Sequence, residues 1–179
     1  HPASDGLQVS NNSKQIMQQR RTILQMLFVE GNHVCPGCEK SGACQLQAVA
    51  YYTGMLSPHF THFFPRREVD ASHEDTAIDY NRCILCELCV RASRDVDHKN
   101  IFAISGRGIG SHLTINAPSG RLGDTDFSAD DKAAHVCPVG AILPKHGAYQ
   151  EPIGKRLYDQ QPVSVVGDVA QHESKLDKG

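Results

Sequence analysis

The distribution of hydrophobic positions predicts two helices in the first third of the chain. Apolar side chains recur at helical spacing over residues 14–29, and Ser13 precedes them as a potential N-cap. A second helix is predicted over 44–52, where Gly54 ends it. Residues 57–76 carry prolines and polar side chains without periodicity, so we expect this segment to be irregular and extended.

A different organisation begins near Ile78. Residues 83–96 are predicted to form a loop that runs into a helix. Short strands are predicted over 101–105 and 112–116, on either side of a glycine-rich turn. A short helix is predicted near 130–136. We therefore expect an α+β protein, in which a small helical domain is followed by an α+β domain.

Composition narrows the function classes. The 179 residues are 40% hydrophobic, which fits one or two small globular domains, and the formal charge of −2 argues against a dominant nucleic-acid surface. The sequence shows neither an apolar run approaching the roughly 20 residues of a spanning helix nor a secretory signal. Seven cysteines, an odd number set in tight runs, are unlike a secreted disulfide framework. They favour metal binding in a reducing, cytoplasmic setting.

The stronger cysteine group lies in the second half of the chain. Cys83, Cys86 and Cys89 form a C-x-x-C-x-x-C run, and Cys137 follows 47 intervening residues later, directly before a proline. Three thiolates at this spacing wrap one face of a cubane and leave one iron for a distant cysteine. In two-cluster ferredoxins a further cysteine four residues on serves another cluster, but here that position is Ser93. The pattern predicts one [4Fe–4S] cluster held by the four cysteines.

The first cysteine group is one ligand short of a cubane. Cys35, Cys38 and Cys44 are the three cysteines left over, so the fourth ligand must be another residue type. His33 precedes Cys35 by two residues, in a segment that a Gly-Asn turn can swing inward, and we predict that it is this ligand. An imidazole in place of a thiolate leaves the cluster less negative and raises its potential. The reserve candidates are His59 and His62.

The residues around these cysteines carry a family resemblance. Residues 28–33 read FVEGNH, residues 39–42 read EKSG, and residues 137–140 read CPVG. The order of the motifs resembles the N-terminal iron–sulfur region of the large subunit of respiratory complex I. It is more similar still to the small, iron–sulfur diaphorase subunit of cytoplasmic NAD-reducing [NiFe] hydrogenases. The resemblance covers about residues 6–160.

The resemblance implies a domain organisation. Such subunits normally begin with a plant-type [2Fe–2S] domain, and residues 1–13 resemble the tail, or linker, of that domain. A [4Fe–4S] domain with one histidine and three cysteine ligands is then expected over 14–76, a ferredoxin-like [4Fe–4S] domain over 77–149 and a polar C-terminal arm over 150–179. In one respect the sequence departs from complex I, where the histidine usually lies four residues before the first cysteine of its group. That position is Gly31 here, and the hydrogenase relatives share the shorter spacing.

The same resemblance implies a function. The chain would be a non-catalytic electron-transfer subunit of an oxidoreductase complex, relaying electrons through two [4Fe–4S] clusters between a [NiFe] hydrogenase module and a flavin module that reduces NAD⁺. The implied partners are the hydrogenase small and large subunits and the flavin- and NAD-binding diaphorase large subunit. The NiFe centre, FMN and NAD would be bound by those partners. No nucleic acid and no membrane span are expected, and the implied location is cytoplasmic.

Two alternatives stay open from the sequence. The chain is also compatible with the iron–sulfur part of a formate dehydrogenase or of an NADH:quinone oxidoreductase. A different class is a zinc-stabilised interaction module. Structural zinc sites typically pair two C-x₂₋₄-C knuckles, and the triple run from Cys83 to Cys89 fits that arrangement poorly.

Overall fold

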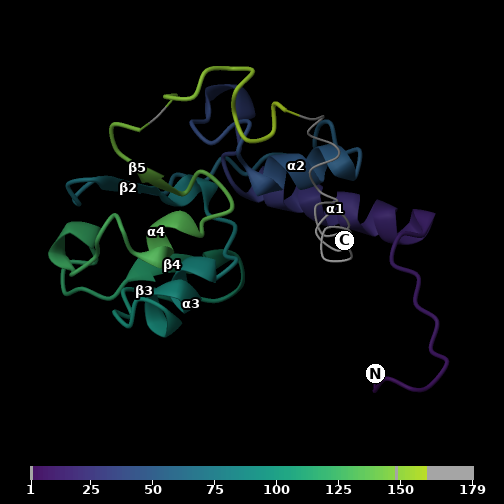
Figure 1. Ribbon diagram of the computed structural model, residues 1–179, viewed down its shortest axis with the longest axis horizontal. Coiled ribbons are helices and arrows are strands. Elements are labelled where there is room, and N and C mark those ends of the chain that lie inside the picture. Colours follow the sequence, from purple (N-terminus) through teal and green to yellow (C-terminus); the bar gives the residue numbers. More distant parts are fainter. Residues whose placement is uncertain (1, 148, 161–179) are drawn as a thin grey trace, which may run out of the picture.

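The computed structural model describes residues 2–147 and 149–160 of the chain. Helices α1 and α2 lie on one side of the molecule and the small sheets lie on the other (Figure 1). This combination of helices with antiparallel strands confirms the expected α+β class. Within the described residues, no helix is both long and apolar enough to cross a membrane.

Two helices form the first region, α1 (Lys14–Glu30) and α2 (Gln45–Tyr52). The side chain of Ser13 accepts a hydrogen bond of 3.3 Å from the backbone N–H three residues later. This contact confirms the predicted N-cap and helix start. Gly31 ends α1, and the chain then turns toward the first cysteines. Cys44 is the N-cap residue of α2, so this cysteine is fixed at the start of a helix.

Two antiparallel sheets form the second region. β1 (Val69–Asp70), β2 (Thr76–Asp79) and β5 (Ile142–Pro144) make a three-stranded sheet with β2 in the middle. β3 (Phe102–Ser105) pairs with β4 (His112–Ile115), which confirms the predicted hairpin. The sheets are small, and two strands of the first adjoin cysteine loops: β2 precedes Cys83, and β5 follows Cys137.

Two short helices complete the second region. α3 (Leu88–Asp95) packs against β3 and against α4 (Lys132–His135), and α4 also contacts β5. Both helices lie where the sequence predicts helical structure. Cys89 therefore sits in the first turn of α3, and Cys137 follows the end of α4. The core between these elements includes Ile78, Ala92, Phe102, Leu113, Leu122 and Ala133.

The structure corrects the prediction that residues 57–76 lack regular structure. β1 lies inside this segment, and β2 begins at its last residue. A strand of two residues has too few positions to show alternation, so the hydrophobic pattern does not reveal it. Tertiary contacts hold it instead. The carboxylate of Asp70 accepts a hydrogen bond of 2.7 Å from the backbone N–H of the distant Leu122, in addition to a local one of 2.9 Å from that of Ser72.

The two regions share a hydrophobic core. Leu24 and Phe28 of α1 belong to one buried cluster with Val139 and Ala141, which precede β5. Such a cluster removes apolar surface of both regions from water at once. The helical region and the α+β region are therefore packed as neighbours and are not separated by a linker.

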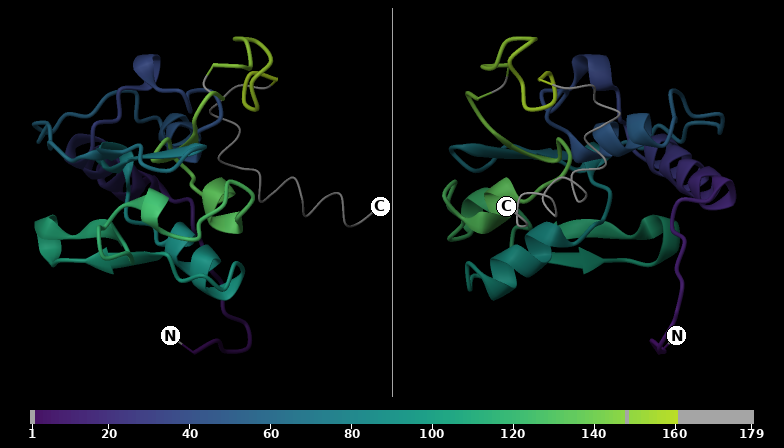
Figure 2. Two further views of the ribbon diagram at one scale, coloured as in Figure 1. Left: turned by 90° about the vertical axis from the view of Figure 1, so that its left-hand side faces the viewer. Right: turned by 45° about the vertical axis from the view of Figure 1, so that its right-hand side comes forward.

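Residues 149–160 lie back against the first region (Figures 1 and 2). The backbone N–H of Tyr158 donates to the carbonyl of Gly42 at 2.9 Å, and its side chain packs on Ala48. The start of the expected C-terminal arm thus contacts its own chain. The rest of that arm, residues 161–179, lies outside the described residues.

Candidate iron–sulfur cluster sites

The first candidate site is a hollow between α1 and α2. His33 reaches it from the turn after α1, Cys35 and Cys38 from the short 3₁₀ turn that follows, and Cys44 from the start of α2. All three cysteines are free thiols. The structure therefore brings the four predicted ligands of this group to one place, where Phe28 and other apolar side chains surround them.

The imidazole of His33 is the least satisfied polar group of this hollow. Among the described residues, its Nε2 is the one buried side-chain nitrogen or oxygen without a hydrogen-bond partner. Burial lowers the pKa of His33 to about 4, so the ring is neutral at physiological pH. An unpaired buried nitrogen costs about 1–3 kcal/mol unless something binds it. A neutral imidazole with a free nitrogen is the form in which histidine ligates a metal, so this side chain fits an iron–sulfur cluster.

The reserve histidines lie elsewhere. His59 is exposed, and its backbone N–H donates to the side chain of Gln25 at 3.0 Å. His62 stacks on Phe64 with ring centroids 5.1 Å apart. Neither lines the hollow that holds the three cysteines of this group. Of the three histidine candidates, His33 alone lines the hollow that holds all three thiols, whereas His62 lines an adjoining hollow that includes Cys35.

The second candidate site gathers the other four cysteines. Cys83, Cys86, Cys89 and Cys137 line a single hollow, and their neighbours there are mostly apolar. Burial and the neighbouring thiols raise the pKa of Cys89 to about 12. The thiol of Cys89 is therefore protonated unless a cation replaces the proton, and the irons of a cluster would supply that charge.

The loop between these cysteines is tightly wound. Leu85 and Glu87 both adopt left-handed backbone conformations, with φ of 55° and 60°. Side chains other than glycine rarely adopt this conformation, and it persists where surrounding structure demands it. Alternating it with ordinary conformations curls the C-x-x-C-x-x-C run around its centre. One N–H of the run, that of Leu85, already points to sulfur and lies 3.5 Å from Cys83 Sγ.

Ser93 occupies the position where a two-cluster ferredoxin has its exchange cysteine. Its side chain is fully buried on α3, and its hydroxyl accepts a hydrogen bond of 2.9 Å from the backbone N–H of Ile101. Two further N–H groups, of Lys99 and Asn100, donate to its carbonyl. Ser93 thus holds the segment that leads into β3 by hydrogen bonds. Its role is structural, whereas the cysteine at this position in two-cluster ferredoxins is a ligand.

The two sites adjoin each other. The backbone N–H of Gln45, next to Cys44, donates to the carbonyl of Pro138, next to Cys137, at 2.9 Å. Gly140 approaches the first site so closely that a Cβ there would lie 3.0 Å from Cys38 Sγ. A loop of each site therefore supports the other.

The contacts of three neighbours of the ligands do not follow from the sequence. That of Gly31 is local but depends on the orientation of a ring, and those of Gly140 and Arg82 are tertiary. Gly31 lies under the His33 ring, Gly140 packs against Cys38, and Arg82 contacts the same cysteine sulfur. All three residues lie close to the cysteines or to His33 in the sequence, and this proximity is the sequence signal that could have identified them. Among the described residues, no three His, Cys, Asp or Glu side chains converge on the position of a single metal ion. Each ligand of a cubane binds a different iron, so cluster ligands stand farther apart than the ligands of one ion.

Comparison with family models divides the chain in the same way. Residues 20–59 match the NADH-ubiquinone oxidoreductase-G iron-sulfur binding region, and residues 77–143 match the 4Fe-4S single cluster domain. The first match covers the first candidate site. The second contains all four cysteines of the second candidate site.

Relatives of known description are similar over most of the chain. The gamma subunit of the NAD-reducing hydrogenase HoxS of Cupriavidus necator is 42% identical over 161 residues, which are 89% of this chain and 68% of that protein. The 75 kDa subunit of the NADH-ubiquinone oxidoreductase of Acanthamoeba castellanii is 30% identical over 82% of this chain, but only 21% of its own length is matched.

A solved structure has the same fold. A chain in the crystal structure of an NAD⁺-reducing [NiFe]-hydrogenase in the H₂-reduced state superposes with a TM-score of 0.86 at 55% identity. The match covers 90% of this chain and 68% of that chain. With the identity to the HoxS relative and the match of both cluster regions, the chain belongs to the family of gamma, iron–sulfur subunits of NAD-reducing hydrogenases.

Proposed function

We propose that this chain binds two [4Fe–4S] clusters and relays electrons between them. The observation that carries the proposal is that eight potential ligands from distant parts of the sequence line two adjoining hollows. The first cluster is held by His33, Cys35, Cys38 and Cys44. The second is held by Cys83, Cys86, Cys89 and Cys137.

The clusters supply one-electron chemistry, and the protein supplies placement and environment. Apolar side chains around each hollow restrict water, which keeps the thiolates bound to iron and influences the potentials. The neutral ring of His33 makes the first cluster less negative than its all-cysteine neighbour, and this favours its reduction. Because a loop of each site supports the other, the two clusters lie on neighbouring parts of one shared core.

We propose that this chain relays electrons as one subunit of a larger complex. Family membership supports a role as a subunit of an oxidoreductase complex, beside a hydrogenase module and a flavin- and NAD-binding diaphorase module. In that setting electrons from H₂ pass through the two clusters to the flavin that reduces NAD⁺. The same proposal includes two domains, one with one histidine and three cysteine ligands (14–76) and a ferredoxin-like one (77–149). It also includes a cytoplasmic location.

Coexpression with the partner subunits tests this function. The complex should contain nickel and should reduce NAD⁺ with H₂. A variant with Cys137→Ala should lose H₂-dependent NAD⁺ reduction, yet keep H₂-dependent reduction of an artificial dye at the hydrogenase module. Formate-dependent reduction with molybdenum, or quinone reduction by NADH, would assign the chain to one of the alternative complexes. Unchanged NAD⁺ reduction in the variant would contradict a relay through the second cluster.

A further inference from the structure

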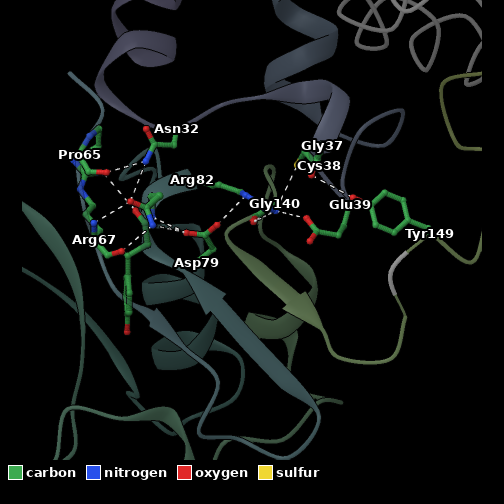
Figure 3. Close-up of polar contacts among 12 residues, drawn as sticks. Asn32, Gly37, Cys38, Glu39, Pro65, Arg67, Asp79, Arg82, Gly140 and Tyr149 are labelled. Atoms are coloured by element: carbon green, nitrogen blue, oxygen red, sulfur yellow. Dashed lines mark hydrogen bonds and ion pairs between the residues drawn. The ribbon is translucent and has the colours of Figure 1, made fainter. Parts of the chain in front are cut away.

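Arg82 lies among polar groups of both regions, between Asp79 on one side and Glu39 with Gly140 on the other (Figure 3). It immediately precedes Cys83, a proposed ligand of the second cluster, but its side chain reaches the first site. Its Nη1 donates to Cys38 Sγ at 3.6 Å and to the carbonyl oxygen of Gly140 at 3.5 Å. A cationic side chain from one cluster loop thus touches the ligand sulfur of the other cluster.

Two carboxylates hold the guanidinium in this position. Nε of Arg82 pairs with Oδ2 of Asp79 at 2.9 Å, and Nη1 also pairs with Glu39. Asp79 belongs to β2 in the second region, whereas Glu39 lies between the cysteines of the first site. The side chain of Arg82 is only 18% exposed. Arginine presents several N–H donors in a fixed planar fork, which suits simultaneous contacts of this kind.

The guanidinium remains charged in this environment. Arginine is always protonated in proteins, because the pKa of its guanidinium lies far above physiological pH. A fixed positive charge therefore lies against Cys38 Sγ.

Such a charge acts on the redox equilibrium of a cluster. Reduction adds an electron, so the reduced cluster is more negative than the oxidised one. Hydrogen bonds to the sulfurs and nearby positive charge stabilise the reduced state more, and this raises the potential. Glu39 and Asp79 oppose the effect at longer range, but the group in contact with sulfur is the guanidinium, and Coulomb interactions weaken with distance.

We propose that Arg82 is a positioning residue that raises the reduction potential of the first cluster while joining the loops of both sites. This inference rests on the proposed function, because it takes Cys38 as a ligand of a [4Fe–4S] cluster. The electrostatic role adds to that of His33, which makes the same cluster less negative from another side.

Redox titration followed by electron paramagnetic resonance tests the inference on the full chain, with its clusters reconstituted anaerobically. Replacement of Arg82 by glutamine (R82Q) should lower the equilibrium constant for reduction of the first cluster at least tenfold, equivalent to about 59 mV for one electron. The second cluster should shift less, because no Arg82 contact to its sulfurs exists among the described residues. R82K keeps the charge but not the planar fork, so its shift should be in the same direction and smaller.

The control is Arg94, an exposed arginine of α3 paired with its neighbour Asp95. R94Q changes the net charge as R82Q does, and both potentials should remain those of the parent. A first-cluster potential that is unchanged in R82Q, or equally lowered in R94Q, would overturn the inference. If R82Q does not bind the first cluster, the test uses R82K instead. A first-cluster potential in R82K equal to that of the parent would then overturn the inference. A parent protein without a first cluster would instead contradict the proposed function.

Discussion

The imidazole of His33 lies directly over Gly31. A Cβ built on Gly31 would stand 2.7 Å from His33 Nε2 and 2.9 Å from its Cδ2, which is closer than real side chains approach. The backbone of Gly31, with φ of −105°, is open to any residue. Glycine is therefore needed at this position for the space that the ring fills.

The first prediction concerns this contact. Gly31→Ala should displace the His33 ring and alter or abolish the first cluster, because the added methyl group would stand only 2.7 Å from Nε2. The second cluster should keep its signal. Electron paramagnetic resonance of the reduced protein distinguishes the two. Gly37→Ala, in the same cysteine loop, is the matched control, since a Cβ there meets nothing within 4 Å. Equal spectra for both variants would contradict a ligand role for the imidazole in this position.

The second prediction replaces the proposed ligand itself. His33→Cys should retain a first cluster, since a thiolate also binds iron, but at a lower potential because the cluster gains negative charge. Redox titration of the variant measures this change. His62→Ala serves as control, because His62 stacks on Phe64 outside the first hollow, and it should behave like the parent. A His33→Cys variant with the spectrum and potential of the parent would remove His33 from the ligand set.

The third prediction concerns Cys137. Its replacement by alanine should lose the second cluster and keep the first, so iron should fall from roughly eight to roughly four atoms per chain. The first cluster is expected to survive because its links to this loop do not involve the side chain of Cys137: they are the backbone hydrogen bond from Gln45 to Pro138 and the packing of Gly140 on Cys38. Iron analysis measures the iron content per chain, and electron paramagnetic resonance spectra show which cluster remains. Loss of both clusters would mean that the two sites fold as one unit.

The fourth prediction separates structure from ligation at Ser93. Ser93→Ala should leave both clusters in place but cost about 1–3 kcal/mol of stability, because the buried N–H of Ile101 loses its partner. A lower urea midpoint for the loss of cluster absorbance would report this cost. Ser119 provides the comparison, since its hydroxyl accepts a similar but exposed bond from Arg121, and Ser119→Ala should change the midpoint little. Loss of a cluster in Ser93→Ala would contradict the structural assignment.

The sequence predicts those elements that have a local signal. The helix capped by Ser13 and the hairpin of β3 and β4 follow from periodicity and turn residues, and the structure confirms both. The sheet of β1, β2 and β5 has no such signal, because its strands are two to four residues long and are stabilised by distant partners. Local pattern cannot encode pairing between Ile78 and Ile142.

The same distinction applies to the candidate sites. Cysteine spacing identifies two groups of ligands, and the odd count singles out a histidine, because both are properties of nearby residues. The contact of Arg82 with Cys38 depends on how the regions meet, and the packing of His33 on Gly31, although local, depends on the orientation of the ring. The resemblance likewise treats the two cluster domains as successive units, whereas in the structure a shared core joins them.

Metal and sulfide analysis of the anaerobically purified chain tests the central claim most directly. The account predicts iron and acid-labile sulfide in equal amounts, roughly eight of each per chain, with two distinct cluster signals in the reduced protein. Zinc bound to a colourless protein, without sulfide, would contradict it and would identify the chain as a zinc-stabilised interaction module.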